Sequence, residues 1–225
     1  KVKFKLNKDP KLFYNYPKIL FDVIYLVDAT ASMVQTIENV RDYCVEIANI
    51  LKNQMKLYDF QFGAIFYRDP VDSKNDKNEY FNLTDKTEEL QIFVQGINAE
   101  GGGDIPEDWV GGYYFAVDKI GWRNGIRLII HIADAGAHGK EYSTNDKYPK
   151  EGPKLDALIQ KCSDKKINIV CFPIGEEPKQ SFERIEKLYK LYGKNKVKIE
   201  KEFDQNKKDP LYFTNMIVES ITKVT

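Results

Sequence analysis

The sequence predicts an α/β fold class: one doubly wound, mostly parallel open sheet with helices on both faces. Apolar runs rich in β-forming residues recur along the chain, at 21–28, 60–67, 126–134 and 167–175. Segments with helical periodicity separate these runs. Apolar strands that alternate with helices form a parallel sheet covered on both faces, so we expect this architecture.

The predicted strands differ in how they are expected to be buried. FDVIYLVD (21–28) is largely apolar on both of its alternating faces, which is typical of a strand buried on both sides. The other long runs share this pattern. EYFNL (79–83) is expected to be an edge strand. KVKIEKEF (196–203) is expected to be another, because its alternating charged residues would leave one face in solvent.

Helical periodicity is clearest just after the first strand. Apolar residues recur there at steps of three and four, which predicts a long helix with one apolar stripe. The stripe consists of Met33, Ile37, Val40, Cys44, Ile47, Leu51 and Met55. Pro153 and Pro210 fall near first helical turns, where proline is favoured. The further helices are predicted over 87–97, 108–120, 152–165, 179–192 and 209–224.

The chain is expected to form one domain. No internal repeat and no long linker divides its 225 residues, so we assign 21–225 to that domain. The basic and aromatic segment 1–20 is expected to be a leader packed along it. Because the chain starts at Lys1 without a signal peptide, we interpret it as a domain of a larger protein.

Composition excludes several classes of partner. The chain is 42% hydrophobic and 30% charged, which suits a soluble globular domain. Lys+Arg and Asp+Glu are equal at 34 each, so net charge gives no reason to expect nucleic acid or an acidic membrane surface. No apolar run approaches the roughly 18 residues of a membrane span.

The three cysteines, Cys44, Cys162 and Cys171, indicate a reducing compartment. Their odd number and wide spacing argue against a disulfide framework and against a zinc site. We therefore expect a cytoplasmic location. The triplet Asn82-Leu83-Thr84 is a glycosylation sequon, which leaves a secreted origin open.

Oxygen-bearing side chains follow the ends of the predicted strands. Asp28, Thr30 and Ser32 come directly after the first strand, and Asp134 ends the run 126–134. In open α/β sheets, ligands bind at the carboxyl ends of the strands. Hydroxyl and carboxylate oxygens together form a hard site that suits Mg²⁺, or alternatively Mn²⁺ or Ca²⁺.

The stretch GGGDIPED (101–108) places further acids next to a glycine run. Two carboxylates held about 4 Å apart repel by ~4 kcal/mol at an effective dielectric constant of about 20. Gathering several of them without a cation would therefore be costly or would force protonation. We interpret the glycines as allowing a tight loop to approach, and the acids as metal ligands.

The stretch VDATAS, with Asp28, Thr30 and Ser32, resembles the D-x-[ST]-x-S signature of von Willebrand factor type A (vWA) domains. The resemblance covers about residues 20 to 225, and it implies the Rossmann-like vWA fold. Members of that family hold a metal ion in a metal-ion-dependent adhesion site. By this resemblance Thr30 and Ser32 are direct ligands, whereas Asp28 and Asp134 hold the ion through water.

The second loop departs from the commonest family pattern. Asp104 stands where many members have threonine. DIPE (104–107) instead resembles the D-x-P-E loop of integrin β-subunit domains, which implies that Glu107 is a direct ligand. GGGDIPED with ADAGAHG (133–139) is most similar to the vWA domains attached to atypical α-kinases, whose kinase domain is absent from this chain.

The integrin resemblance also implies a possible second metal site. FGAIFYRDP resembles the integrin β strand that gives an aspartate to a neighbouring Ca²⁺ site, although the spacing differs by one residue. Asp69 with Asp104 and Glu107 would form such a site here. A further adjacent site of that family needs acids where Val34 and Gln35 stand, so we reject it.

The same residues also have structural interpretations. The D-x-T-x-S residues 28–32 could cap the long helix, and Asp134 could cap a loop. Glu107 and Asp108 could be acids of a first helical turn.

Histidine and arginine residues near the predicted site are given structural roles. His138 is expected to order a loop by a hydrogen bond rather than to bind metal. His131, inside an apolar strand, is expected to be a satisfied core histidine. Arg68, beside Asp69, is expected to form a surface or loop ion pair.

The sequence predicts divalent-cation-dependent protein binding, not catalysis. The resemblance implies that Mg²⁺ leaves one coordination position for an Asp or Glu of a protein partner. Two alternatives stay open: a metal-assisted hydrolase with His138 as base, and a scaffold whose metal only stabilises the loops. GGGD lacks a following Gly-Lys-Ser/Thr, so nucleotide binding is disfavoured, and no nucleophile–base pair is evident.

Overall fold

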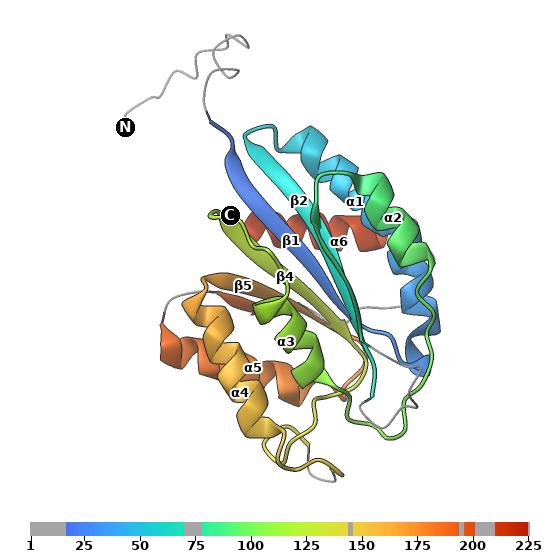
Figure 1. The fold of residues 1–225 in the computed structure, drawn as a ribbon, viewed down its shortest axis with the longest axis vertical. Coiled ribbons are helices and arrows are strands. Elements are labelled where there is room, and N and C mark those ends of the chain that lie inside the picture. Colours follow the sequence, from blue (N-terminus) through green and yellow to red (C-terminus); the bar gives the residue numbers. More distant parts are fainter. Residues whose placement is uncertain (1–16, 70–77, 144–145, 194–195, 201–209, 225) are drawn as a thin grey trace.

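The predicted fold class is confirmed in a computed structural model of the chain (Figure 1). The structure describes residues 17–69, 78–143, 146–193, 196–200 and 210–224. The strands are β1 (Ile19–Asp28), β2 (Tyr58–Tyr67), β3 (Glu79–Thr84), β4 (Ile126–Ala133), β5 (Ile167–Pro173) and β6 (Val197–Ile199). The helices are the 3-10 turn η2 (Ala31–Met33), α1 (Val34–Gln54), α2 (Thr87–Gln95), α3 (Trp109–Asp118), α4 (Gly152–Asp164), α5 (Lys179–Tyr192) and α6 (Pro210–Val224). Each predicted element therefore has a counterpart.

The strands form one sheet in the order β3-β2-β1-β4-β5-β6. Neighbours pair in parallel, except that β2 and β3 are antiparallel. The chain first adds β2 and β3 on one side of β1, and then crosses to add β4, β5 and β6 on the other side. The carboxyl ends of β1 and β4 therefore flank the topological switch point, where ligands bind in sheets of this kind.

Two apolar cores lie on the two faces of the sheet (Figure 1). Helices α1, α2 and α6 cover one face, and α3, α4 and α5 cover the other. Alternate residues of β1 enter the two cores and are fully buried: Phe21, Val23, Tyr25 and Val27 on the α1 side, Ile24 and Leu26 on the α3 side. Burial on both faces explains the largely apolar run of this strand.

The predicted stripe of the long helix faces the first of these cores. Its residues from Met33 to Leu51 are buried, and Met55 at the helix end is half-buried. Within the described ranges, no helix is both long enough and apolar enough to cross a membrane.

Two predicted segments differ from the structure or fall outside it. β6 is an edge strand, as predicted for 196–203, but its three residues are all half-buried, so the expected fully solvated face is not seen. Val197 and Ile199 pack against the α5 side, and Lys198 pairs with Glu200, so neither face is left in solvent. Residues 201–203 and the leader residues 1–16 lie outside the described part of the chain.

A buried ion pair closes the amino end of β1. Asp22 is 1% exposed, and its Oδ1 accepts a hydrogen bond from Arg123 Nε over 2.6 Å. Its Oδ2 accepts from the backbone N–H of Arg123 over 2.7 Å. The guanidinium of Arg123 also donates to the backbone oxygen of Asp59 over 2.7 Å. Both oxygens of this buried carboxylate are therefore paired.

Candidate metal centre

Three loops meet at the carboxyl ends of β1 and β4. The backbone N–H of Ala31, after β1, donates to the oxygen of Gly101 over 3.2 Å. The backbone N–H of Glu107 donates to the oxygen of Gly136, after β4, over 2.9 Å. Backbone hydrogen bonds therefore hold together the three segments in which the sequence predicted metal ligands.

Asp28 lies at the bottom of this arrangement. It is the last residue of β1, and it is fully buried. Its Oδ1 accepts from the backbone N–H of Thr30 over 2.9 Å and from the Thr30 hydroxyl over 2.7 Å. Its Oδ2 is buried without a hydrogen-bond partner. The Thr30 hydroxyl in turn lies 3.3 Å from Ser32 Oγ, so the D-x-T-x-S spacing produces a row of oxygens that leads outward from Asp28.

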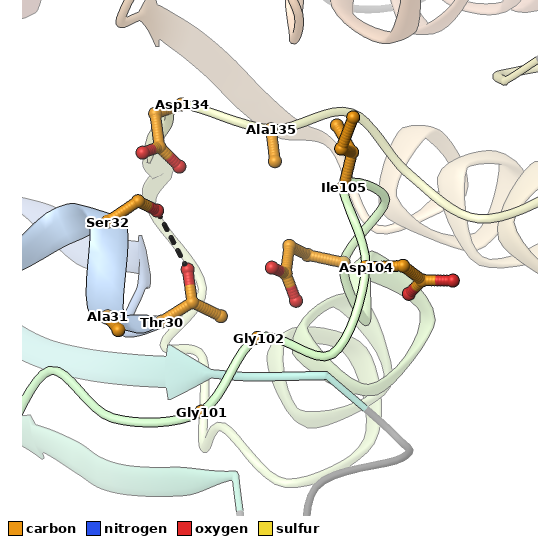
Figure 2. Close-up of a pocket in the computed structure, with 10 residues that line it drawn as sticks. Thr30, Ala31, Ser32, Gly101, Gly102, Asp104, Ile105, Asp134 and Ala135 are labelled. Carbon is orange, nitrogen blue, oxygen red and sulfur yellow. Dashed lines mark hydrogen bonds between the residues drawn. The ribbon is translucent and has the colours of Figure 1, made fainter.

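A cavity of 310 Å³ lies beside these oxygens (Figure 2). Ser32 and Asp134 point their oxygens into it in Figure 2. Five of the six predicted metal-binding residues line this cavity, and the sixth, Asp28, is fully buried and hydrogen-bonded to Thr30. The lining residues are Thr30, Ala31, Ser32, Gly101, Gly102, Asp104, Ile105, Glu107, Asp134 and Ala135.

The pKa values of the two aspartates at the strand ends are raised. Burial first, and then the charge of Asp134, raise the pKa of Asp28 from 3.8 to about 7, against the lowering effect of the Thr30 hydrogen bonds. Burial also raises the pKa of Asp134, whose Oδ1 has no hydrogen-bond partner. A nearby cation would favour the ionised form of both carboxylates. Carboxylate and hydroxyl oxygens are the ligands that Mg²⁺ and Ca²⁺ prefer, so the donor set fits a divalent cation.

Helix capping does not explain the D-x-T-x-S residues. Thr30 precedes η2 and Met33 precedes α1, and neither makes a side-chain hydrogen bond to the helix. Asp108, in contrast, is the N-cap of α3, and its Oδ1 accepts from the N–H of Gly111 over 2.7 Å. The helical interpretation is therefore confirmed for Asp108, whereas Glu107 lies before the helix and lines the cavity.

Asp104 is oriented differently from the other predicted metal-binding residues. It lines the cavity, but in Figure 2 its carboxylate points away from Ser32 and Asp134. Its Oδ2 lies 3.1 Å from Lys147 Nζ. The chain bends through 103–106, and the side chain of Asp104 projects from this bend. The structure instead brings Asp104 together with Asp69 and His138.

Both histidines make the structural hydrogen bonds expected of them. His138 Nδ1 lies 2.6 Å from Asp146 Oδ1, so the predicted loop-ordering hydrogen bond is confirmed. His131 is fully buried, and its two ring nitrogens contact the hydroxyls of Tyr67 over 2.9 Å and Tyr113 over 3.1 Å. Burial lowers the pKa of His131 well below its usual value, so it is a neutral core histidine with satisfied nitrogens.

Arg68 forms the expected ion pair, but not at the surface. It is 4% exposed, and its Nη2 lies 3.2 Å from Glu79 Oε1 at the start of β3. Its backbone oxygen also accepts from the N–H of Asp108 over 3.1 Å. Arg68 therefore ties the end of β2 to the start of α3.

Residues 22–198 match the sequence profile of the family described as von Willebrand factor A domain. The chain belongs to this family. As a vWA domain, it is 35% identical over 203 residues to alpha-protein kinase vwkA of Dictyostelium discoideum, covering 87% of this chain and 32% of that protein. It is 25% identical over 229 residues to integrin beta-1 of Gallus gallus, covering 83% of this chain and 27% of that protein. The vWA domain thus spans about a third of the length of these relatives, and its predicted kinase-associated and integrin-like similarity is confirmed.

Solved structures share the fold of this vWA domain. The SpRpn10 VWA domain superimposes with a TM-score of 0.54 at 11% identity, covering 81% of this chain and 88% of that one. Proximal thread matrix protein 1 from the mussel byssus gives a TM-score of 0.57 at 13% identity, covering 92% of this chain and 46% of that one. At such identities the likeness shows the fold alone.

Two residues near the vWA cavity were not singled out in the sequence. Asp146 and Lys147 lie in the loop before α4 and contact His138 and Asp104. Their spacing from the D-x-T-x-S motif carries no recognisable pattern. A charged pair in a polar loop is ordinary in sequence, so only the folded loop identifies them.

Gly102 is expected to be required for full metal affinity. Its φ is +96°, and an added Cβ would lie 3.4 Å from Thr30 Cβ and 3.5 Å from Glu107 Oε1. Left-handed backbone costs a residue with a side chain about 1–2 kcal/mol. We therefore expect Gly102→Ala to weaken Mg²⁺ binding about tenfold in a calorimetric titration, with the fold retained.

Gly121→Ala is the matched control for this glycine. Its added Cβ would meet only Asn82 side-chain atoms, at 3.7 Å, and it lies away from the cavity. Equal Mg²⁺ affinities for the Gly102→Ala and Gly121→Ala proteins would contradict the proposed role of the glycine loop.

Proposed function

We propose that this vWA domain binds a protein partner through a divalent cation, and that an Asp or Glu of the partner completes the coordination. The observation that carries the proposal is the convergence of Thr30, Ser32, Glu107 and Asp134 on one solvent-accessible cavity. Asp28 supports them from behind, with a buried oxygen that lacks a hydrogen-bond partner. This set supports the ligand roles that the family resemblance implies.

Mg²⁺ is the ion that we propose, with Mn²⁺ or Ca²⁺ as alternatives. Thr30, Ser32 and Glu107 would hold it directly, and Asp28 and Asp134 would hold it through water. When bound, the ion would attract a carboxylate, since hard divalent cations prefer oxygen ligands. Supporting hydrogen bonds, such as those from Thr30 to Asp28, orient such ligands.

The rim of the cavity also suits a protein partner. Ile105 lies on the lining and is 64% exposed. An exposed large apolar side chain next to a charged centre can bury apolar area of a partner, whereas a free carboxylate ion offers none. Ile105 therefore supports a peptide or protein ligand over a small anion.

Hydrolysis by this site has less support. The hydrolase alternative needs His138 as a base at the cavity, but His138 is 2% exposed and is not among the lining residues. Its Nδ1 is engaged by Asp146. A base must come within hydrogen-bond reach of the group that it deprotonates, so we propose that this chain is not itself an enzyme.

The cellular context is likewise a proposal. The likeness to alpha-protein kinase vwkA supports a chain that is one domain of a larger protein, in which any kinase activity belongs to another segment. Cys44, Cys162 and Cys171 are free and buried, which supports the expected cytoplasmic location.

Binding of immobilised acidic peptides tests the proposal. The probe is a set of peptides with a central Asp, each with an Asn twin that differs only in that residue. We expect Asp peptides to be retained in Mg²⁺ and released by a chelator, with little retention of the Asn twins. Asp134→Ala should abolish retention and lower Mg²⁺ affinity by about 10–100-fold, because it removes a carboxylate that would hold the ion through water.

Asp85→Ala is the control for that experiment, since Asp85 is an exposed aspartate between β3 and α2. It should leave both Mg²⁺ affinity and peptide retention unchanged. Equal retention of Asp and Asn peptides would refute a coordinating carboxylate. Mg²⁺-dependent stability without peptide retention would favour the scaffold alternative.

A further inference from the structure

We propose that Asp69, Asp104 and His138 form a second metal site, which selects a borderline transition-metal ion such as Zn²⁺. One ligand atom of each residue lies within 4.8 Å of the others. Asp69 is 3% exposed and His138 is 2% exposed. The three residues come from three different loops: the end of β2, the glycine loop and the loop before α4.

His138 is oriented as a metal ligand would be. Its Nδ1 lies 2.6 Å from Asp146 Oδ1, and because a carboxylate accepts, Nδ1 carries the proton. Asp146 is itself fixed, since its Oδ1 accepts from the N–H of Tyr148 over 2.9 Å and its Oδ2 accepts from the N–H of Gly139. The lone pair of His138 is thereby placed on Nε2. Metal-binding histidines commonly donate their other ring nitrogen to a carboxylate in this way.

The Nε2 atom of His138 has no hydrogen-bond partner although its residue is almost completely buried. The nearest acid of the cluster is Asp69, whose Oδ1 lies 3.8 Å away, which is too long for a hydrogen bond. Buried polar atoms normally find partners, and each exception requires an explanation. A cation between the imidazole nitrogen and the carboxylate would supply one.

Asp104 gives a second, independent indication. Its Oδ2 lies 3.1 Å from Lys147 Nζ, but its Oδ1 is buried without a hydrogen-bond partner. Asp69 is already positioned, because its Oδ2 accepts from the N–H of Gly103 over 3.0 Å. Lys147 thus fixes one oxygen of Asp104 and leaves the other without a hydrogen-bond partner, while the N–H of Gly103 positions Asp69.

This site differs from the first one in position and in chemistry. Asp69 and His138 do not line the cavity of Ser32 and Asp134, and the carboxylate of Asp104 points away from that cavity (Figure 2). The first site offers only oxygen ligands, which suit Mg²⁺ and Ca²⁺. An imidazole with two carboxylates instead suits Zn²⁺ and its transition-metal neighbours.

The test is a Zn²⁺ titration by calorimetry with the first site saturated by excess Mg²⁺. We expect one equivalent of Zn²⁺ to bind the parent protein. His138→Gln should weaken Zn²⁺ binding by more than about 100-fold, and Asp146→Asn, which alters only the supporting carboxylate, by about 10–100-fold. Co²⁺ as a second probe should give a visible absorption band in the parent that is lost in His138→Gln.

Three controls separate this site from other sources of binding. Asp28→Asn should lose Mg²⁺ binding and retain Zn²⁺ binding. The experiment therefore distinguishes an absent first site from an absent second site. Asp85→Asn should bind both ions normally. Asp104→Asn replaces the carboxylate by an amide of the same shape and should also weaken Zn²⁺ affinity. This second variant is needed if a melting curve shows that His138→Gln disturbs the fold.

Two results would overturn the second site. One is the absence of Zn²⁺ binding in excess Mg²⁺. The other is equal Zn²⁺ affinity in the parent and in both the His138→Gln and Asp104→Asn proteins. Imidazole binding of Zn²⁺ can be assigned to His138. The other histidine in the sequence, His131, is fully buried and both of its ring nitrogens contact tyrosine hydroxyls.

Discussion

Asp28→Asn is expected to make the metal-free protein more stable, by about 2 kcal/mol at pH 7.5. Ionising the buried carboxylate, whose pKa is raised from 3.8 to about 7, costs on the order of 4 kcal/mol. The amide nitrogen of asparagine would replace an oxygen that has no partner, and leaving it unpaired costs about 1–3 kcal/mol. Removal of the buried charge is the larger effect, so the variant gains stability. Urea unfolding in a chelator measures the difference.

In Mg²⁺ the order of the two proteins should reverse. An ion present at about 100 times its dissociation constant stabilises the parent by ~2.7 kcal/mol. Asp28→Asn removes the charge that supports the bound ion, so the variant should gain almost nothing. A variant that is less stable than the parent in both chelator and Mg²⁺ would show that Asp28 is needed by the fold itself.

The difference between the two proteins should also depend on pH. The pKa of Asp28 is higher in the folded state, so its favourable contribution is fully present below 3.8 and is lost as pH rises through about 7. The metal-free parent should therefore approach the stability of Asp28→Asn as pH falls from 7.5 towards 4. His131 acts in the opposite direction, because its pKa is lowered, but both proteins contain it and its effect cancels in the difference. A difference that stays constant over this range would contradict a buried carboxylate as its cause.

The sequence was sufficient for the fold class because each element carries a local signal. β1 has apolar residues on both faces, which predicts a strand covered on both sides. α1 has one apolar stripe, which predicts a helix packed on the sheet through that stripe. The strand order was not predicted, because crossover helices alone do not determine on which side of β1 each later strand pairs. Among the elements, β6 is the exception, since its half-buried state depends on contacts with α5 and Glu200 that no local pattern encodes.

Placement at the cavity could be predicted for residues that directly follow strands, and for Glu107 from the resemblance of its loop to D-x-P-E. Thr30, Ser32 and Asp134 reach the cavity because strand ends fix their positions. Asp104 belongs to a loop that bends through 103–106, and there the backbone conformation, not the residue order, decides where the carboxylate points. The role of Asp146 could not be predicted from the sequence either, because it depends on one hydrogen bond to His138 that forms only in the folded loop.

Asp22→Asn should have the opposite effect to Asp28→Asn, although both residues are aspartates of β1. Asp22 is 1% exposed and Asp28 is fully buried, so burial does not separate them. Their partners do, since both oxygens of Asp22 accept hydrogen bonds from Arg123, at 2.6 and 2.7 Å. Removing one partner of a buried ion pair costs about 3 kcal/mol or more, because the other charge is left unpaired.

We expect Asp22→Asn to destabilise the protein by about 3 kcal/mol, equally in chelator and in Mg²⁺. Six residues of strand separate Asp22 from Asp28, a distance of about 20 Å, so Mg²⁺ affinity should not change. Urea unfolding and Mg²⁺ calorimetry on the two variants make each the control of the other. If both variants stabilised the metal-free protein, burial alone would govern these carboxylates and the case for a cation at Asp28 would weaken. Opposite signs, with Mg²⁺ affinity lost only in Asp28→Asn, would mean that Asp28 lacks the partner that Asp22 has and that a metal ion supplies it.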